Sequence, residues 1–593
     1  MGWLKTLATG ALLLANTQAL AQEKPLIIHQ PDTTYTLNEV VLDSVLVTPN
    51  NTPKRIKSSR QALAHANPIH HLAKYTGIQT VIPGVSAEPE ANIPGQITFY
   101  NHHNLPILTS STQNHSLTST IPSNLTKLQL DQPNAQKTSA DAVITLTQQY
   151  HETKNLHADP LHQVASYATG EDNKLQVAIV AENNAPGPLE HLIEELSAYA
   201  TTQSIHAATR LQTNNTEAEI ITNYQVSDNE FGELFDAHLF QEIDKNTSIF
   251  TNAQQTLGEF TLQASYAHQQ SSQETHLEEI YKKLHTTIDQ LTANNYQLAI
   301  HNPNTTLSFQ HHDLKRAKPD TTTHHHVNQL TLSHQRLLGQ KLHVQAQTRI
   351  DHHQTTNASI STQATIKATN NLALQATLAS LHDAVTNHQP RRGLREATTH
   401  YKSTSTNQAS MQATYTTNSW FVETQLQGKK IDLHWYGQPA TINATIIQAR
   451  AQHTINNPRY TLVTQTNIQT RNSRLETPTK TTSVPGPAAL QTSLQVEYAR
   501  DNFSATASIH YHSNREQALD AQTTASLGQL CLLNLGVTKQ IGKIQAGLSI
   551  SNALSLVSKN KVFAYQKRTS DKESEITYVY GAPLPKLSIN VDF

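Results

Sequence analysis

The chain has 593 residues, of which 43 are Lys or Arg and 45 are Asp or Glu, so its formal net charge is only −2. This balance excludes the overall basic field that nucleic-acid-binding proteins carry. Charged residues make up 15% and apolar residues 37% of the chain, which excludes both a highly charged disordered chain and a bundle of transmembrane helices.

The N-terminus predicts export through a signal peptide over 1–21. Lys5 supplies an early positive charge, an apolar stretch runs from about 7 to 15, and Ala19-Leu20-Ala21 fits the small-x-small cleavage pattern. Cys531 is the single cysteine, so no internal disulfide can form. No later stretch approaches about 18 apolar residues, so we expect a secreted protein, a periplasmic protein or an outer-membrane barrel.

From about Tyr150 to Phe593, short segments of alternating polar and apolar residues recur between Asn-, Asp-, Ser- and Thr-rich stretches. Alternation with a period of two predicts strands with two different faces. In a transmembrane barrel one face meets lipid and the other lines a polar interior, which suits a chain rich in Gln, Thr, His and Asn. The clearest predicted strands are Lys341–Ile350, Asn371–Leu381, Ser410–Tyr415, Trp420–Leu426, Leu494–Tyr511 and Lys586–Phe593.

One passage has a different period. In Pro188–Ala200 the apolar residues Leu189, Leu192, Ile193 and Leu196 follow helical spacing, which predicts either a short helix in a loop or a strand with a misleading pattern.

The histidines cluster into pairs and one triplet. A metal or haem site is one interpretation, and polar residues used freely in loops and lumen are the other. Adjacent side chains on a strand face opposite sides, so a pair rarely chelates one ion, and we predict no metal site. The clusters are His70-His71, His102-His103, His311-His312, His324-His325-His326 and His352-His353.

The sequence lacks the motifs of common enzymes: no phosphate loop, nucleophile elbow, Cys–His pair or metalloprotease helix is present. The paired carboxylates Glu194-Glu195 and Glu278-Glu279 are adjacent and do not converge on one substrate. The basic cluster Arg391–Arg395 is either a grip for an anionic ligand or a solvated loop. We therefore expect no enzyme and no cofactor.

Three separated regions share their order and spacing with one family. The first is the β-prone string Asp43, Ser44, Val45, Leu46, Val47 and Thr48. The second lies within 60–150 and includes Ile121–Leu130, and the third includes Ile550–Leu554 and the aromatic-terminated segment Tyr580–Phe593. Together these regions resemble the TonB-dependent outer-membrane receptors, in which such a string is the TonB box that the energy-coupling protein captures by strand addition.

The resemblance implies a mainly β fold, a 22-stranded antiparallel transmembrane β-barrel with an N-terminal globular plug domain inside it. It divides the chain into a signal peptide at 1–21, a periplasmic segment with the TonB box at 22–50, a plug at 51–150 and the barrel at 151–593. The barrel portion allows about 20 residues for each strand and its connection, enough for a strand of about 10 residues.

The sequence departs from the family at its plug glycines. Asp131-Gln132-Pro133 stands where the family has Arg-Gly-Pro, and Ala142-Val143-Ile144 stands where it has Gly-Gly-Val. Glycine permits positive φ and close backbone approach, so we expect these turns to be rebuilt or strained.

The resemblance implies a monomer in the bacterial outer membrane that binds and imports a scarce ligand of the ferric siderophore, cobalamin or haem class. Its partners would be TonB, outer-membrane lipid and that small-molecule or metal-chelate ligand, with no nucleic acid; the sequence does not identify the ligand-binding residues. Two alternatives stay open: a structural or adhesive outer-membrane β-protein with a vestigial plug, and a secreted β-rich binding protein.

Overall fold

The computed structural model describes most of the C-terminal three quarters of the chain and shorter stretches before it. The described residues are 40–41, 79–80, 89–90, 97–107, 126–131, 134–137, 142–148, 150, 152–158, 162–170, 174–184, 198–232, 237–279, 285–318, 321–339, 341–353, 355–386, 402–435, 438–457, 460–479, 481–483, 490–518, 524–557, 561–568, 574–580 and 583–592. The predicted signal peptide, the predicted TonB box at 43–48 and the basic cluster Arg391–Arg395 lie outside them.

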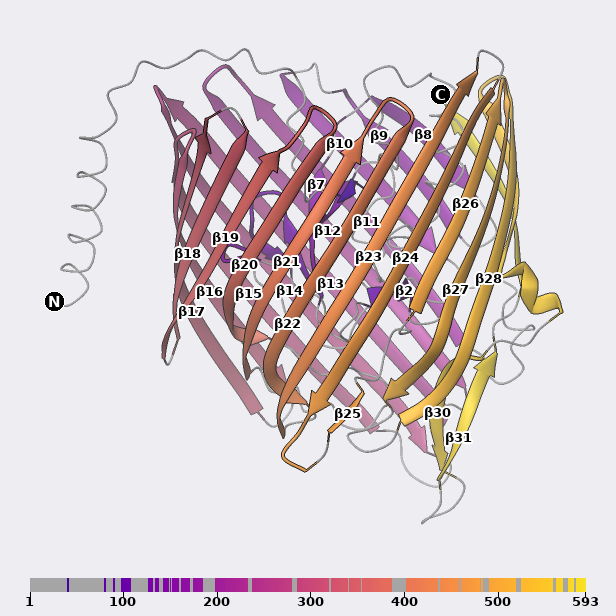
Figure 1. The fold of residues 1–593 in the computed structure, drawn as a ribbon. Coiled ribbons are helices and arrows are strands. Elements are labelled where there is room, and N and C mark those ends of the chain that lie inside the picture. Colours follow the sequence, from indigo (N-terminus) through magenta and orange to yellow (C-terminus); the bar gives the residue numbers. More distant parts are fainter. Residues whose placement is uncertain are drawn as a thin grey trace. The chain divides into compact units, whose positions relative to one another are not determined.

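The described part of the chain after residue 150 forms a closed antiparallel barrel of 22 strands (Figure 1). Each strand pairs with the next, and the last strand pairs with the first. The first half of the ring consists of β8 (Thr153–Ala158), β9 (His162–Ala168), β10 (Leu175–Asn184), β11 (Ala198–Gln212), β12 (Thr216–Gly232), β13 (Ala237–Leu257), β14 (Phe260–Glu279), β15 (His285–His301), β16 (Thr305–Lys318), β17 (Thr321–Leu338) and β18 (Leu342–His352).

The second half of the ring consists of β19 (Thr356–Lys367), β20 (Leu372–Thr386), β21 (Lys402–Thr416), β22 (Trp420–Trp435), β23 (Gln438–Asn457), β24 (Tyr460–Glu476), β26 (Leu490–Arg500), β27 (Phe503–Ala518), β28 (Thr524–Ile541), β29 (Ile544–Ser551) and β32 (Leu584–Asp592). Short elements lie at one end of the barrel. The strand β25 (Thr481–Ser483) pairs with β24. The 3₁₀ helix η3 (Ala553–Leu556) precedes a hairpin of β30 (Lys561–Arg568) and β31 (Ser574–Tyr580).

Alternation along the strands separates a polar inner face from an apolar outer face. On β15, Gln297 is 2% exposed, whereas its neighbour Leu298 is 62% exposed. On β23, Gln448 is buried and Ile447 is exposed. The abundant Gln, Thr and Ser residues thus line much of the interior, and many of the large apolar residues lie on the outside.

The two ends of the barrel differ in the length of their connections. At one end most strands are joined by turns of two to four residues, such as 213–215, 258–259 and 302–304. At the other end the sequence between strands is longer at 185–197, 387–401 and 552–583. The short turns contain residues suited to a tight reversal, for example Gly258 with a φ of 64°.

A separate five-stranded sheet, the plug sheet, lies inside the ring (indigo in Figure 1). Its order is β1-β6-β7-β4-β5, with β4 and β7 parallel and the other pairs antiparallel. Its strands are β1 (Val40–Val41), β4 (Ile97–Asn101), β5 (Pro106–Ile107), β6 (Thr126–Asp131) and β7 (Ala142–Gln148), and β2 (Gln79–Thr80) and β3 (Pro89–Glu90) form a second small pair.

Contacts to widely spaced barrel strands hold the plug sheet inside the ring. The Gln269 amide on β14 donates to the Pro106 carbonyl at 2.9 Å. The backbone N–H of Ala135 donates to Ser361 Oγ on β19 at 3.1 Å. An apolar cluster joins Leu105 of the plug to Val180, Ile221 and Phe250 of the wall. The plug therefore meets the wall on several sides.

Asparagine residues form two of the plug turns, one of them directly after Asp131-Gln132-Pro133, where the family's glycine is absent. The Oδ1 atom of Asn134, just after Asp131-Gln132-Pro133, accepts from the backbone N–H groups of Gln136 and Lys137 at 2.9 and 2.8 Å. Asn104, in the turn after β4, takes the left-handed conformation with a φ of 62°. Among non-glycine residues, Asn tolerates this conformation well and replaces a backbone turn with its side chain.

The predicted fold class is confirmed, and each of the clearest predicted strands overlaps a strand of the ring. Of the helix-like segment Pro188–Ala200, only 198–200 are described, and they begin β11. Among the described residues, no helix is long and apolar enough to cross a membrane.

Candidate functional site

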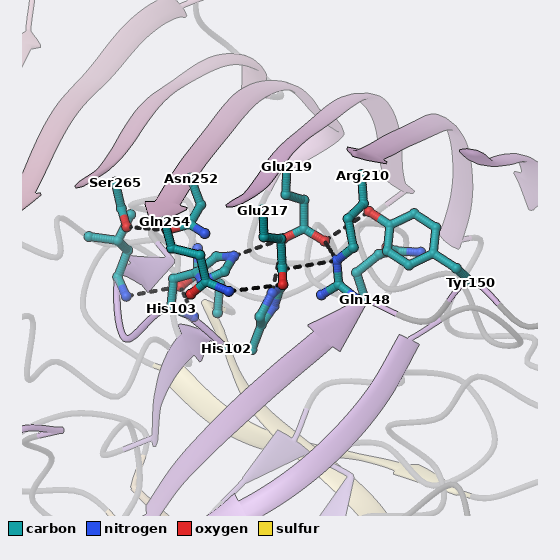
Figure 2. Close-up of polar contacts among 12 residues, drawn as sticks. His102, His103, Gln148, Tyr150, Arg210, Glu217, Glu219, Asn252, Gln254 and Ser265 are labelled. Atoms are coloured by element: carbon teal, nitrogen blue, oxygen red, sulfur yellow. Dashed lines mark hydrogen bonds and ion pairs between the residues drawn. The ribbon is translucent and has the colours of Figure 1, made fainter. Parts of the chain in front are cut away.

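A cluster of polar contacts between plug and wall surrounds Glu219 on β12 (Figure 2). Glu219 is 2% exposed, and it follows Glu217 at a spacing of two, so both side chains face inward near the short-turn end of the strand. An inward carboxylate is costly to bury unless donors surround it. The donors here come from the plug, from the connection that precedes β8, and from β11.

The plug supplies His102 and His103 from a tight turn between β4 and β5. The Oδ1 atom of Asn101 accepts from the backbone N–H groups of His103 and Leu105 at 3.0 and 2.9 Å, and the left-handed Asn104 completes the reversal. In a turn, unlike a strand, consecutive side chains do not have to face opposite ways. Both imidazoles consequently point at the wall (Figure 2).

Both histidines contact the same oxygen of the carboxylate. Nε2 of His102 lies 2.9 Å and Nε2 of His103 lies 2.8 Å from Glu219 Oε2. The two rings are themselves 3.8 Å apart between centroids and tilted by 46°. Burial lowers the pKa of His103 below its ordinary value, and the hydrogen bond to Glu219 opposes that shift. A neutral His103 donates its Nε2–H to the carboxylate.

The other carboxylate oxygen has its own donors. The hydroxyl of Tyr150 donates to Glu219 Oε1 at 2.8 Å, and Nε of Arg210 lies 3.4 Å from the same atom. Burial and the neighbouring Glu219 raise the pKa of Tyr150, so its hydroxyl stays protonated and remains a donor. Arg210 also contacts Glu217 Oε1 at 3.2 Å and lies over the Tyr150 ring.

A second layer of amides extends the junction over three barrel strands. The amide of Gln254 donates to Glu217 at 2.9 Å, and that of Gln263 lies 3.4 Å from Nδ1 of His103. Gln263 also donates to Asn252 and accepts from Nε2 of His301 at 2.8 Å. His103 is therefore connected on one side to the Glu219 carboxylate and on the other to a chain of neutral groups.

This arrangement fastens the plug to the wall but leaves the fastening reversible. Charge-assisted hydrogen bonds to a buried carboxylate are among the stronger polar contacts, and they break without covalent chemistry. The neighbouring pair His206 and Gln148 adds a similar link, with Nε2 of His206 2.6 Å from Oε1 of Gln148. A plug that moves or unfolds locally must first break these contacts.

The histidine clusters divide into two geometries. On β16 the adjacent His311 and His312 take different partners, Asn328 and Asn295, as expected of neighbours on a strand. Among the described residues, two groups bring three metal-ligating side chains together: His102, His103 and Glu219, and the more exposed Asp313, His324 and His326. The strand rule does not apply to the first group, because His102 and His103 lie in a turn.

Glu219, Arg210 and Tyr150 were not predicted as site residues from the sequence. The available signal was the inward register of β12, which places Glu217 and Glu219 beside a lumen otherwise lined by uncharged polar groups. The predicted TonB-binding residues 43–48 are outside the described residues, although Val40 and Val41 just before them pair with Leu130 and Gln129 of β6.

Solved structures share the fold of this protein over most of its chain. The ferric enterobactin receptor PfeA of Pseudomonas aeruginosa matches with a TM-score of 0.68 at 9% identity, over 89% of this chain and 96% of that one. The ferric yersiniabactin uptake receptor FyuA of Yersinia pestis matches with a TM-score of 0.64 at 10% identity, over 88% and 95%. The copper transporter OprC matches with a TM-score of 0.68 at 10% identity, over 88% and 96%.

The chain has the fold of a TonB-dependent receptor. A β-barrel with a plug is common to the sequence resemblance, to this structure and to these neighbours. All three are described as receptors or transporters. No protein-family model matches the sequence, and no curated protein matches it either.

Proposed function

We propose that this protein is an outer-membrane receptor that binds a scarce ligand at the long-loop end and imports it into the periplasm with energy from TonB. One observation carries the proposal: the plug sheet occupies the ring and is fastened to its inner face at several points. A blocked barrel passes a ligand only when the plug moves, and that movement needs an external source of energy.

The outer face supports a position in the membrane. Many strands carry large apolar side chains that project outward and are exposed. Leu298, Leu378, Ile447 and Leu587 are examples. Outer-membrane barrels carry such an apolar band and have short turns on the periplasmic side and longer loops outside. The end with turns of two to four residues is therefore the periplasmic end.

Energy coupling is assigned to residues Asp43–Thr48. Its sequence is β-prone, so an edge strand of TonB can capture it through main-chain hydrogen bonds. Its neighbours Val40 and Val41 pair with β6 of the plug sheet. A pull on 43–48 would load these pairs first and reach the plug before the barrel.

The ligand class is a metal chelate, with ferric siderophores as the first candidates. PfeA and FyuA are described as receptors for ferric enterobactin and ferric yersiniabactin, and OprC as a copper transporter. Missing plug glycines would favour the vestigial-plug alternative if the turns could not form without them. Asn134 forms the turn after Asp131-Gln132-Pro133 without glycine, so this departure from the family does not favour a vestigial plug.

In-cell disulfide crosslinking tests the coupling. Cys531→Ser removes the single native thiol, Val45→Cys places one in the string, and a cysteine scan covers the TonB C-terminal domain. Asn418→Cys, in the exposed short turn after β21, is the matched control for a periplasmic thiol outside the string. We expect a crosslink at Val45→Cys that strengthens when a candidate ferric chelate is added, and none at Asn418→Cys.

Fractionation and growth complete the test. The protein should be in the outer-membrane fraction, and deleting its gene should abolish growth on one limiting ferric chelate of a panel. A protein in the outer membrane that never crosslinks would refute TonB coupling. A protein found in the culture supernatant would refute the barrel and favour a secreted binding protein.

A further inference from the structure

We propose that His102, His103 and Glu219 form a transition-metal site, of the Zn²⁺ or Cu²⁺ class, that clasps the plug to the barrel wall. The ligand atoms of these three residues all lie within 4.8 Å of one another. The proposal does not depend on which ligand the receptor transports, because the site lies between two parts of the protein itself.

The donor set suits such an ion. Two imidazole nitrogens and one carboxylate oxygen form the protein ligands of many zinc sites that keep a further position open. Imidazole also favours zinc and copper over calcium and magnesium, which prefer all-oxygen ligation. Both histidines present the same atom, Nε2, to the same oxygen of Glu219, so the three donors converge instead of lying in a row.

The distances require only a small adjustment. Ligands placed about 2.1 Å from a tetrahedral zinc ion lie roughly 3.3 Å from one another. The two Nε2 atoms are 2.9 and 2.8 Å from Glu219 Oε2, so each contact has to open by about half an ångström. Nδ1 of His102 is buried and has no hydrogen-bond partner among the described residues, so this ring can move without breaking another bond.

The local charge also favours a cation. Glu217 and Glu219 carry two negative charges, and Arg210, which contacts both, carries one positive charge. The two carboxylates therefore exceed the one guanidinium among these three side chains by one negative charge. Arg210 and Tyr150 occupy Oε1 of Glu219, and Oε2, which faces the histidines, is the oxygen available to an ion.

The surroundings can support the required tautomer. A metal on Nε2 of His103 places the ring proton on Nδ1, and Gln263 lies 3.4 Å from that atom. If the amides of Gln263 and Asn252 both turned over, the Gln263 oxygen would accept that proton and a proton from the Asn252 amide. The Gln263 NH₂ would then face Nε2 of His301, which would accept a hydrogen bond instead of donating one. Hydrogen-bonded partners of this kind orient metal-binding histidines.

The consequence is a link between ion binding and plug movement. Two ligands come from the plug turn and one from β12, so an ion bound to all three resists separation of the plug from the wall. By linkage, any force that displaces the plug lowers the affinity for the ion.

Metal binding to the full-length protein tests the site. Protein purified in detergent and stripped with a chelator is titrated with Zn²⁺ and with Cu²⁺, and bound metal is counted by mass spectrometry. We expect one ion at this site and at least a 10-fold weaker affinity in His102→Gln, in His103→Gln and in Glu219→Gln. His206→Gln is the matched control, since this buried histidine on β11 bonds to Gln148 and Asn223 outside the group.

Two spectroscopic readouts separate this site from the surface group Asp313, His324 and His326. In a variant with His324→Gln and His326→Gln, electron spin-echo spectroscopy of bound Cu²⁺ should still detect two imidazoles, and His103→Gln should reduce the number to one. Zn²⁺ should slow hydrogen exchange of the amides at 101–107 at least 10-fold in the wild type and leave His103→Gln unchanged.

Other results would overturn the metal site or its role as a clasp. Absence of a bound ion in the folded wild type, or full metal retention when both His102 and His103 are Gln, would overturn the site. A bound ion that leaves exchange at 101–107 unchanged would overturn the clasp. If Glu219→Gln fails to fold, the two histidine variants and the wild-type spectrum decide the question alone. Each of these results is distinct from a missing crosslink at Val45→Cys, which bears only on transport.

Discussion

Nε2 of His103 in the plug turn lies 2.8 Å from Oε2 of Glu219 on β12, and the two residues are separated by 116 positions in the sequence. This contact joins the two parts of the protein that have to separate if a ligand is to pass. The free energy of this hydrogen bond therefore contributes to the energy needed to move the plug.

A double-mutant cycle measures that strength. Hydrogen bonds to charged groups contribute about 1.5–3 kcal/mol, so we expect His103→Gln and Glu219→Gln to be coupled by that amount in metal-free protein. The readout is the free energy of local opening at residues 101–105 from native-state hydrogen exchange. Asp501→Asn is the control, because its ion pair with Arg500 is largely exposed and should leave this opening unchanged. Additive effects of the two substitutions would contradict the coupling.

The left-handed Asn104 gives a second prediction. Its φ of 62° costs a β-branched residue roughly 1–2 kcal/mol, so Asn104→Val should increase opening of the turn, whereas Asn104→Gly should leave it unchanged or tighter. Hydrogen exchange at 101–107 measures both variants. Equal effects of Val and Gly would show that side-chain packing, and not the backbone, determines the conformation at this position.

Two outward positions on β23 test the proposed position in a membrane. Ile447 is near the middle of the strand, and Ile455, which shares its face, is near the short-turn end. Arg on the lipid face costs about 2–4 kcal/mol at the bilayer midplane and ~0–1 kcal/mol near the interface. Folding titrations in lipid vesicles should find Ile447→Arg more destabilising than Ile455→Arg. The reverse order would contradict the assigned depth.

A buried ion pair lies on the inward face of β18. We expect the loss of stability to be larger when one of its residues is replaced than when both are. Nε and Nη2 of Arg349 lie 3.0 and 2.7 Å from Oδ2 of Asp351, and both side chains are almost fully buried. Asp351→Asn leaves an uncompensated charge and should cost about 3–5 kcal/mol in a denaturant titration. Replacing both residues with Met and Leu should cost less than that single change. A larger cost for the double replacement would show that Arg349 depends more on its other partners, such as the carbonyl of His382.

The fold was predictable from the sequence because a barrel repeats one simple pattern. Alternation at Lys341–Ile350 and Leu494–Tyr511 is preserved in β18, β26 and β27, with short reversals such as the one at Asp501. The plug turns were harder to predict, because the expected glycines are absent and the replacing asparagines act through their side chains. Asn101 and Asn134 hold turns whose geometry depends on hydrogen bonds that no periodicity reveals.

The junction was not predictable for a related physical reason. His102 and His103 converge on Glu219 only after a turn, a strand register and the position of the plug have all been fixed. Adjacent side chains on a strand face opposite sides, and His311 and His312 on β16 follow this rule. The same rule was the reason to expect no shared ligand for His102 and His103. The exception arises where Asn101 and Asn104 reverse the chain.

The join between β32 and β8 involves only four residue pairs, against 20 between β13 and β14. It is also the least local of the barrel's pairings, because it links the first strand of the ring to the end of the chain. Such contacts form late. The ring therefore cannot close until β32 is present, and removal of Ile589–Asp592 would leave an open sheet with two unprotected edges prone to aggregate.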